Sequence, residues 1–148
     1  MRIQINGARL IDPASKLDQQ ADIFIDDGKI VALGDTPRGF VADQMIDANG
    51  LIAAPGLVDL SASLREPGYG RKGSIASETR AAAAGGITSL CCTPHTKPIL
   101  DTAAVVDLIL DKTRDEGSCK VFPLGAFTQG LDGERLAELV TLRNAGCV

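Results

Sequence analysis

The alternation of apolar and polar residues changes character about a third of the way along the chain. Residues 1–54 contain short apolar runs separated by turn residues, and the runs at 23–25 and 29–33 flank Asp26-Asp27-Gly28. An Asp-Gly pair between two apolar runs is typical of a β-hairpin. A second turn, at 47–50, precedes the apolar run 51–54. The pattern predicts a small β domain over residues 1–54.

From Pro55 to Val148, short strand-like runs alternate with segments of helical periodicity. The predicted strands are 57–64, 87–93 and 120–127, and the predicted helices are 75–84, 102–116 and 134–144. Ser74 and Asp101 are the expected N-caps of the first two helices. Three successive strand–helix units predict an α/β fold with a parallel sheet and right-handed crossovers. An open doubly wound sheet and a (β/α)₈ barrel both satisfy this pattern. For a barrel, residues 55–148 are the first three of eight units and therefore incomplete.

The strand at 57–64 has a polar face. Strict alternation places Leu57, Asp59, Ser61 and Ser63 on that face, and the apolar residues at even positions on the other. In a barrel the even positions are expected to lie under helices. Ser61 and Ser63 are expected to point inward near the C-terminal mouth, where barrel enzymes build their active sites.

Charge and cysteine content exclude several classes. The chain has 148 residues, a net charge of -4 and a pI of about 4.9, without a basic stripe. This balance disfavours nucleic acids and anionic membrane surfaces as partners. No apolar run reaches the roughly 20 residues of a membrane span, and polar residues interrupt the N-terminus where a signal peptide needs an apolar run. The four cysteines form no C-x-x-C pair, which favours buried reduced thiols and a cytoplasmic location.

Several segments resemble the dihydroorotase branch of the amidohydrolase superfamily. Residues 55–68 read P-G-L-V-D-L-S-A-S-L-R-E-P-G, which is similar to the family's P-G-L-V-D-x-H-x-H-x-R-E-P-G. Residues 80–88, 93–96 and 125–130 resemble the family's next helix and strand, its P-N-T loop and its third strand. The resemblance covers nearly the whole chain. It implies a composite β domain followed by a TIM-type metallo-dependent hydrolase barrel.

The sequence departs from this family at its metal ligands. The two histidines of H-x-H bind the family's catalytic zinc, and Ser61 and Ser63 occupy those positions here. A neutral hydroxyl is a weak zinc ligand compared with imidazole or thiolate, and His95 is the only histidine of the chain. Without zinc, no hydroxide nucleophile forms near neutral pH. We therefore expect no metal cofactor and no catalytic residue in this chain.

The resemblance also implies a degenerate substrate pocket. The family holds the substrate carboxylate with an arginine, which Arg65 matches, and with an asparagine, which His95 replaces. Because carboxylate binding loses its purpose without catalysis, a structural role for Arg65, paired with Glu66 or another acid, is favoured. Asp59 matches an aspartate near the family's metal site. Because an unpaired buried carboxylate is costly, we expect Asp59 to bond to the two serines or to a backbone group.

Other patterns carry weaker signals. No G-x-S-x-G elbow surrounds Ser61 or Ser63, which disfavours a serine nucleophile. The glycine-rich segment 68–73 lacks the G-K-[ST] ending of a phosphate-binding loop, so a flexible connection is expected there. The acidic residues of the helix at 102–116 are typical of a solvated face.

Three functions remain open at this point. The resemblance implies a non-catalytic subunit of pyrimidine biosynthesis. Such a subunit would form a homo-oligomer within a larger hetero-oligomer with the catalytic chain of aspartate carbamoyltransferase. A metal-dependent cyclic amidohydrolase with altered ligands is one alternative. A pyrimidine-binding protein without catalysis, using Arg65, is the other.

A barrel limited to three units would also expose apolar sheet faces and self-associate.

Overall fold

The computed structural model describes all residues, 1–148, and divides them into two compact units, Met1–Pro55 and Gly56–Val148. The boundary lies one residue beyond the predicted one. Each unit has its own core of buried side chains, and the two cores share no residue. None of the helices has the length and apolar character that a membrane span requires. The α/β fold class predicted from the pattern is confirmed.

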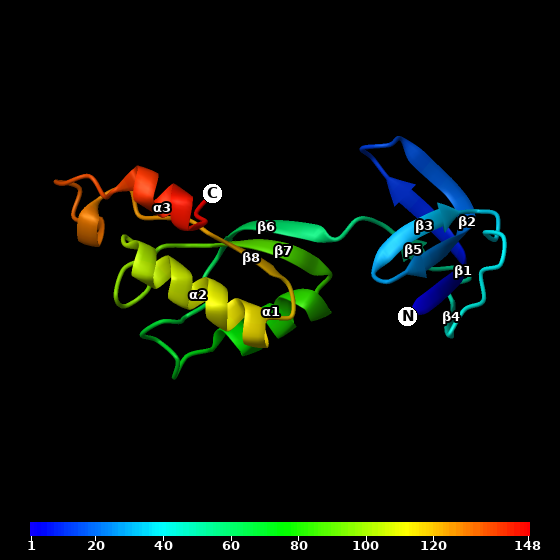
Figure 1. The fold of residues 1–148 in the computed structure, drawn as a ribbon, viewed down its shortest axis with the longest axis horizontal. Helices are drawn as coiled ribbons and strands as arrows, with labels where there is room; N and C mark the ends of the chain where they lie inside the picture. Colours follow the sequence, from blue (N-terminus) through cyan, green and yellow to red (C-terminus); the bar gives the residue numbers. More distant parts are fainter. The chain divides into compact units, whose positions relative to one another are not determined.

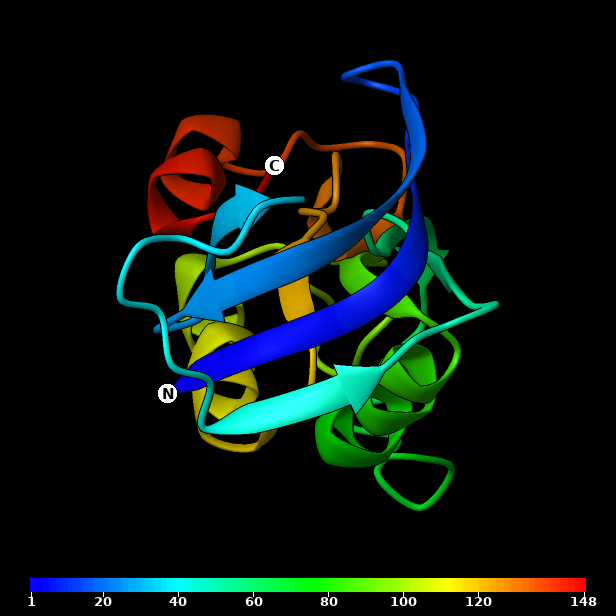
Figure 2. The same ribbon diagram turned by 90° about the vertical axis from the view of Figure 1, so that its right-hand side faces the viewer.

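The first unit is a five-stranded sheet. Its strands are β1 (Arg2–Asp12), β2 (Leu17–Asp26), β3 (Lys29–Leu33), β4 (Gln44–Asp47) and β5 (Ile52–Ala53). The order is β3-β2-β1-β4, and β5 also pairs with β1. Figure 2 shows β2, β1 and β4 side by side in blue to cyan. The predicted hairpin is present, because Asp27 and Gly28 both adopt positive φ angles between β2 and β3.

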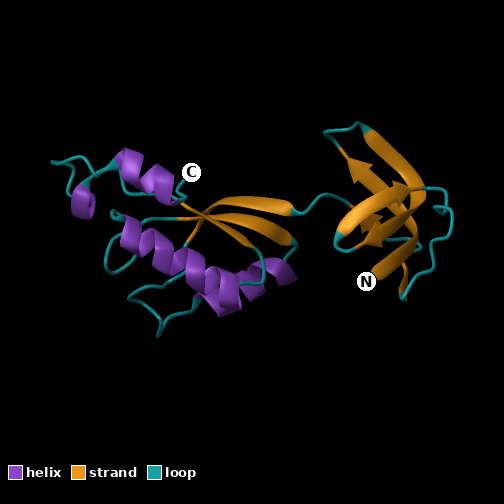
Figure 3. Cartoon of the chain, viewed as in Figure 1, coloured by secondary structure: helices purple, strands orange, loops and turns teal.

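The second unit is a three-stranded parallel sheet with helices packed against it. Its strands, in the spatial order β6-β7-β8, are β6 (Leu57–Ala62), β7 (Ile87–Cys92) and β8 (Lys120–Pro123). The helices are α1 (Ile75–Ala84), α2 (Ala103–Glu116), the 3₁₀ helix η1 (Gln129–Leu131) and α3 (Leu139–Ala145). Helices α1 and α2 lie along one face of the sheet (Figures 1 and 3). Leu90 and Cys92 of β7 meet Val106 and Ile109 of α2 in the buried core.

The ends of the helices follow local hydrogen bonding. Ser74 caps α1 as expected, since its Oγ accepts a bond from the backbone N–H of Ser77 at 3.1 Å. The prediction that Asp101 caps α2 is wrong. Thr102 is the N-cap residue and makes no side-chain cap bond. The Asp101 carboxylate instead accepts a 2.7 Å bond from the N–H of Gly130, which lies in η1.

The last strand and the last helix are shorter than predicted. The Leu124 N–H makes the last bond to β7, to the Cys92 carbonyl at 2.9 Å, and the Ala126 N–H then bonds to the Leu100 carbonyl at 2.7 Å instead of extending the ladder. Residues 128–136 then form a turn closed by an antiparallel bridge between Thr128 and Leu136. This turn takes up the first part of the predicted helix 134–144, and α3 begins only at Leu139.

Candidate functional site

The residues singled out from the sequence lie at the carboxyl ends of β6 and β7. The Thr93 N–H donates a 2.9 Å hydrogen bond to the Ala62 carbonyl, which extends the contact of the two strands past their assigned ends. The Ser63 and Thr93 hydroxyl oxygens are 3.5 Å apart. The parallel sheet thus brings the loops that follow β6 and β7 next to each other.

The expected alternation of faces along β6 is wrong. The pairing with β7 shifts between Asp59 and Ala62, so Asp59 stands opposite Leu90 and Ala62 opposite Cys92. Leu90 and Cys92 both belong to the core beneath the helices. Asp59 and Ala62 therefore face the helix layer together, although they are three residues apart. A bulge of this kind adds one residue to a strand and reverses the faces of the residues beyond it.

The apolar even positions of β6 are only partly covered. Val58 is 61% exposed and Leu60 is 72% exposed, whereas Leu64 is 1% exposed. The expectation that all even positions lie under helices is wrong for the first two. Asp59 uses its Oδ1 to accept a 2.9 Å hydrogen bond from the N–H of Ser61. Of the partners expected for Asp59, the structure shows the backbone group and neither serine hydroxyl.

A groove of about 430 Å³ runs along β6 beside α1. It brings together three of the residues singled out from the sequence, Asp59, Ser63 and Arg65. On the α1 side it is lined by Glu78 together with Ala81 and Ala82. Ser61 and His95 do not line this groove. The groove combines carboxylates, a hydroxyl and one guanidinium, which suits polar recognition but supplies few metal ligands.

Glu66, rather than Arg65, makes the ionic contacts of the loop that follows β6. Its Oε2 accepts a 2.9 Å bond from the N–H of Ile75 at the start of α1. Its Oε1 accepts a 2.9 Å bond from the Lys112 ammonium on α2. The Ile75 N–H, followed by Lys112, holds the pKa of Glu66 below its usual range. The expected pairing of Arg65 with Glu66 is therefore wrong, and the Arg65 side chain makes no ion pair or hydrogen bond.

His95 lies exposed in the turn that follows β7. Its side chain makes no hydrogen bond. The turn is held instead by Thr96, which is 3% exposed and donates from Oγ1 to the Pro98 carbonyl at 2.8 Å. The Lys97 N–H donates a 2.9 Å bond to the Pro67 carbonyl and joins this turn to the loop after β6. The structure therefore links the loops that carry Arg65 and His95 through their backbones.

The donor set at this edge does not fit a zinc ion. Ser61 and Ser63 are exposed hydroxyls, and Asp59 faces the helix layer with one oxygen already engaged. No group of three or more histidine, cysteine or acidic side chains anywhere in the chain is placed to hold a metal ion. The four cysteines are free thiols, and burial raises the pKa of Cys92, Cys119 and Cys147. Cys92 lies in the core of the second unit and Cys119 and Cys147 pack against it, as small apolar groups do.

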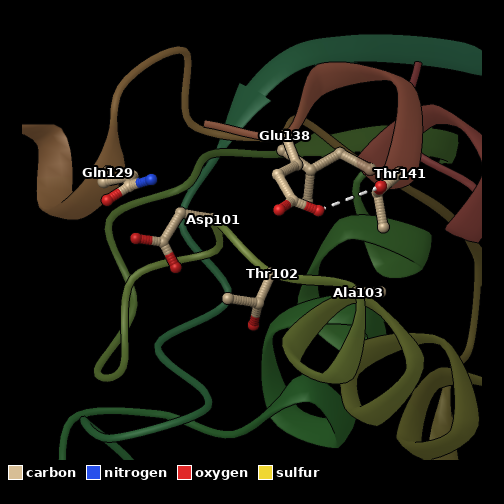
Figure 4. Close-up of a pocket in the computed structure, with 7 residues that line it drawn as sticks. Asp101, Thr102, Ala103, Gln129, Glu138 and Thr141 are labelled. Atoms are coloured by element: carbon tan, nitrogen blue, oxygen red, sulfur yellow. Dashed lines mark hydrogen bonds between the residues drawn. The ribbon is translucent and has the colours of Figure 1, made fainter. Parts of the chain in front are cut away.

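A second cavity, of about 360 Å³, lies at the start of α2, and no pattern in the sequence predicted it. Figure 4 shows Asp101, Gln129 and Glu138 around it, from three different segments. The Glu138 carboxylate accepts a 3.2 Å bond from the Thr141 hydroxyl, and Asp101 is bonded to Gly130. Both acids therefore have partners within the chain. Only the turn at 128–136 brings these segments together, and no local sequence signal marks it.

The fold is shared with amidohydrolase-type proteins of known structure. The chain superposes on the L-hydantoinase (dihydropyrimidinase) of Arthrobacter aurescens with a TM-score of 0.76 and 25% identity, over 98% of this chain and 31% of that one. A family model described as dihydro-orotase-like matches residues 50–148. The chain therefore belongs to the dihydroorotase-like family.

Its curated relatives carry related names. The chain is 64% identical to a dihydroorotase-like protein of Pseudomonas aeruginosa and 62% identical to one of Pseudomonas putida, each over all 148 residues. It is 43% identical over the same length to a dihydroorotase of Trichlorobacter lovleyi. In each comparison the chain spans 35% of the relative's length.

Proposed function

We propose that this chain belongs to a non-catalytic dihydroorotase-like subunit that supports the assembly and activity of aspartate carbamoyltransferase in pyrimidine biosynthesis. The subunit acts in the cytoplasm, binds no zinc and forms a homo-oligomer within a hetero-oligomer with the transferase catalytic chain. In this role the subunit keeps the fold of its family but has lost the family's zinc-dependent hydrolysis.

One observation carries the proposal. Hydroxyl groups stand at positions 61 and 63, where the resemblance places zinc-binding imidazoles. Asp59 stands opposite the buried Leu90 of β7, and its Oδ1 already accepts a bond from the Ser61 N–H, so this carboxylate is a poor substitute for the missing ligands. Zinc both generates the hydroxide nucleophile and polarises the scissile carbonyl in hydrolases of this kind. A site without imidazole ligands loses both contributions, while the core and the surfaces of the fold remain free to serve another purpose.

Co-expression with the catalytic chain of aspartate carbamoyltransferase tests the assembly role. We expect the two proteins to elute together in size-exclusion chromatography, and transferase activity to fall when this subunit is omitted. The double variant Ser61→Ala/Ser63→Ala serves as the control that removes the two hydroxyls at the family's ligand positions. It should assemble as well as the wild type because both side chains are exposed. Separate elution together with unchanged transferase activity would overturn the proposal.

Metal analysis and a hydrolysis assay test the absence of chemistry. We expect no stoichiometric zinc in the purified protein and no turnover of dihydroorotate above the uncatalysed rate. One zinc per chain with dihydroorotate hydrolysis would favour the active cyclic amidohydrolase instead.

The groove beside β6 supports a second candidate, a pyrimidine-binding protein without catalysis. Arg65 lines the groove without an ionic partner, and a guanidinium is well suited to bind a carboxylate. Calorimetry with orotate measures this binding, and Arg65→Gln should abolish it. The absence of heat at millimolar orotate would exclude this candidate.

A further inference from the structure

Positive charge is concentrated in one stretch of an otherwise acidic chain. Between Asp59 and Asp101 the chain holds five of the 15 lysine and arginine residues but only two of the 19 acidic residues. The two acids are Glu66, which is bonded to Lys112, and Glu78 on α1. The Glu78 carboxylate lies beside Gly73 and in the same groove as Arg65. The rest of the chain is strongly acidic by comparison. The overall net charge of -4 therefore conceals a local excess of positive charge.

The structure gathers most of this charge on the loop between β6 and α1. Arg65, Arg71 and Lys72 are exposed on this loop, and Lys97 is exposed on the neighbouring turn. Lys97 packs directly against Gly68, where an added Cβ would collide with the lysine backbone and side chain. Figure 1 shows the segment between β6 and α1 looping away from the sheet. We use the name basic loop for this group of residues, which comprises Arg65, Tyr69, Arg71 and Lys72 on the loop itself and Lys97 on the neighbouring turn.

Contacts within the chain hold the basic loop in shape. The Glu66 carboxylate ties its first part to α1 and α2, through Ile75 and Lys112. The Tyr69 N–H donates to the Arg65 carbonyl at 2.8 Å. The Lys72 ammonium lies 5.8 Å from the centre of the Tyr69 ring, within range of a cation–π contact. The loop was expected to be a flexible connection, but these contacts give it a defined conformation, which lowers the entropy lost on binding.

We infer that the basic loop is a docking surface for an acidic surface of a partner protein. Tyr69 is 41% exposed and sits among the cations, and tyrosine and arginine are enriched in protein interfaces. Complementary charge of this kind sets the encounter rate and the orientation of two proteins. The partner's identity, the aspartate carbamoyltransferase catalytic chain, rests on the proposed function. The acidic chemistry of the partner surface is inferred from the charge of the basic loop alone.

The size of the basic loop favours a protein partner over a nucleic acid. A nucleic-acid site typically neutralises several phosphates along a continuous track. The basic loop offers four cations on one loop and its neighbouring turn, and the acidic remainder of the chain repels a long polyanion. A protein surface that carries carboxylates can bind such a loop through only a few local ion pairs.

Binding of a fluorescent oligoglutamate peptide to the full chain tests the chemistry. We expect the wild type to bind at low salt and Arg71→Glu/Lys72→Glu to bind at least about tenfold more weakly. The matched control Lys29→Glu/Arg38→Glu makes the same charge change at exposed positions of the first unit and should bind like the wild type. Arg71→Glu alone leaves the Lys72–Tyr69 contact in place and should show a smaller loss without a change in fold.

Equal binding by the loop variant and the control variant would overturn the inference. Tighter binding of a single-stranded oligodeoxynucleotide or of inorganic phosphate than of the peptide would also overturn it. A pull-down with the transferase catalytic chain separates the two proposals. If the wild type and Arg71→Glu/Lys72→Glu capture it equally, the partner assignment of the loop fails and the proposed function stands. If neither captures it while the peptide still binds, the proposed function fails and the docking chemistry stands.

Discussion

At the residue scale, Glu66 is the side chain that organises the R-E-P-G run at residues 65–68. The resemblance directed attention to Arg65, because an arginine can bind a carboxylate. In the structure the Glu66 side chain is 16% exposed and bonds to both helices, whereas Arg65 is exposed and unpaired. Within this motif, Glu66 therefore holds the loop in its conformation, whereas Arg65 is exposed to solvent on the loop. The sequence did not separate these two roles.

The Glu66 contacts predict a pH-dependent stability. The pKa of Glu66 lies below its ordinary value of 4.5 in the folded chain, because the Ile75 N–H and Lys112 stabilise the carboxylate. Its contribution is fully present above the unfolded value and is lost as pH falls through the lower folded value. Glu66→Gln should lower the free energy of unfolding by about 1–3 kcal/mol at neutral pH and flatten the acid side of the profile.

Urea denaturation at neutral and acidic pH measures this effect. Asp107→Asn removes an equal charge from an exposed position of α2 and serves as the control. A Glu66→Gln variant as stable as this control at neutral pH would show that the two bonds contribute nothing.

At the scale of elements, a buried hydroxyl joins α1 to the segment that leads into β8. Thr79 is fully buried, and its Oγ1 donates to the Ile75 carbonyl at 2.6 Å. The same oxygen accepts a 3.1 Å bond from the Ser118 N–H. One hydroxyl thus satisfies a backbone donor 39 residues away, which no helical periodicity could reveal.

Replacing this hydroxyl should destabilise the second unit. Thr79→Val keeps the volume but leaves the Ser118 N–H without an acceptor, at a cost of about 1–3 kcal/mol. Thr79→Ser keeps the hydroxyl and loses one methyl group, so it should retain the Ser118 contact. Chemical denaturation of both variants measures the difference. Equal stability of the valine variant and the wild type would contradict this account.

The helices were easier to predict than the last strand and the turn after it. Helix α1 follows directly from its Ser74 cap and its alanine-rich sequence. The turn at 128–136 arises from bonds such as that between Gly130 and Asp101, which are 29 residues apart. Local propensity contains no information about a partner at that distance.

At the scale of the whole molecule, the chain contains two separate cores. Phe24 is fully buried in the first unit and meets Phe40 edge-on with ring centres 5.2 Å apart. Ile109 is fully buried in the core of the second unit. Each core is completed by residues of its own unit, so damage to one should leave the other folded.

Hydrogen exchange read separately for the two units tests this independence. Phe24→Ala should cost about 3–5 kcal/mol and raise exchange in residues 1–55, with little change in 56–148. Ile109→Ala should cost about 2–5 kcal/mol and do the reverse. Loss of protection in both units by either variant would show that they unfold together.

The sequence by itself determined the two-part organisation, the hairpin at Asp27-Gly28, the α/β class and the serines at the family's ligand positions. These features depend on residue identity and on short-range periodicity, which are fully present in the linear chain. Only the tertiary structure decided the bulge between Asp59 and Ala62, the partners of Glu66 and the position of Lys97 beside the loop after β6. Each of these depends on contacts between segments distant in sequence, where strand register and packing, not local preference, fix which groups meet.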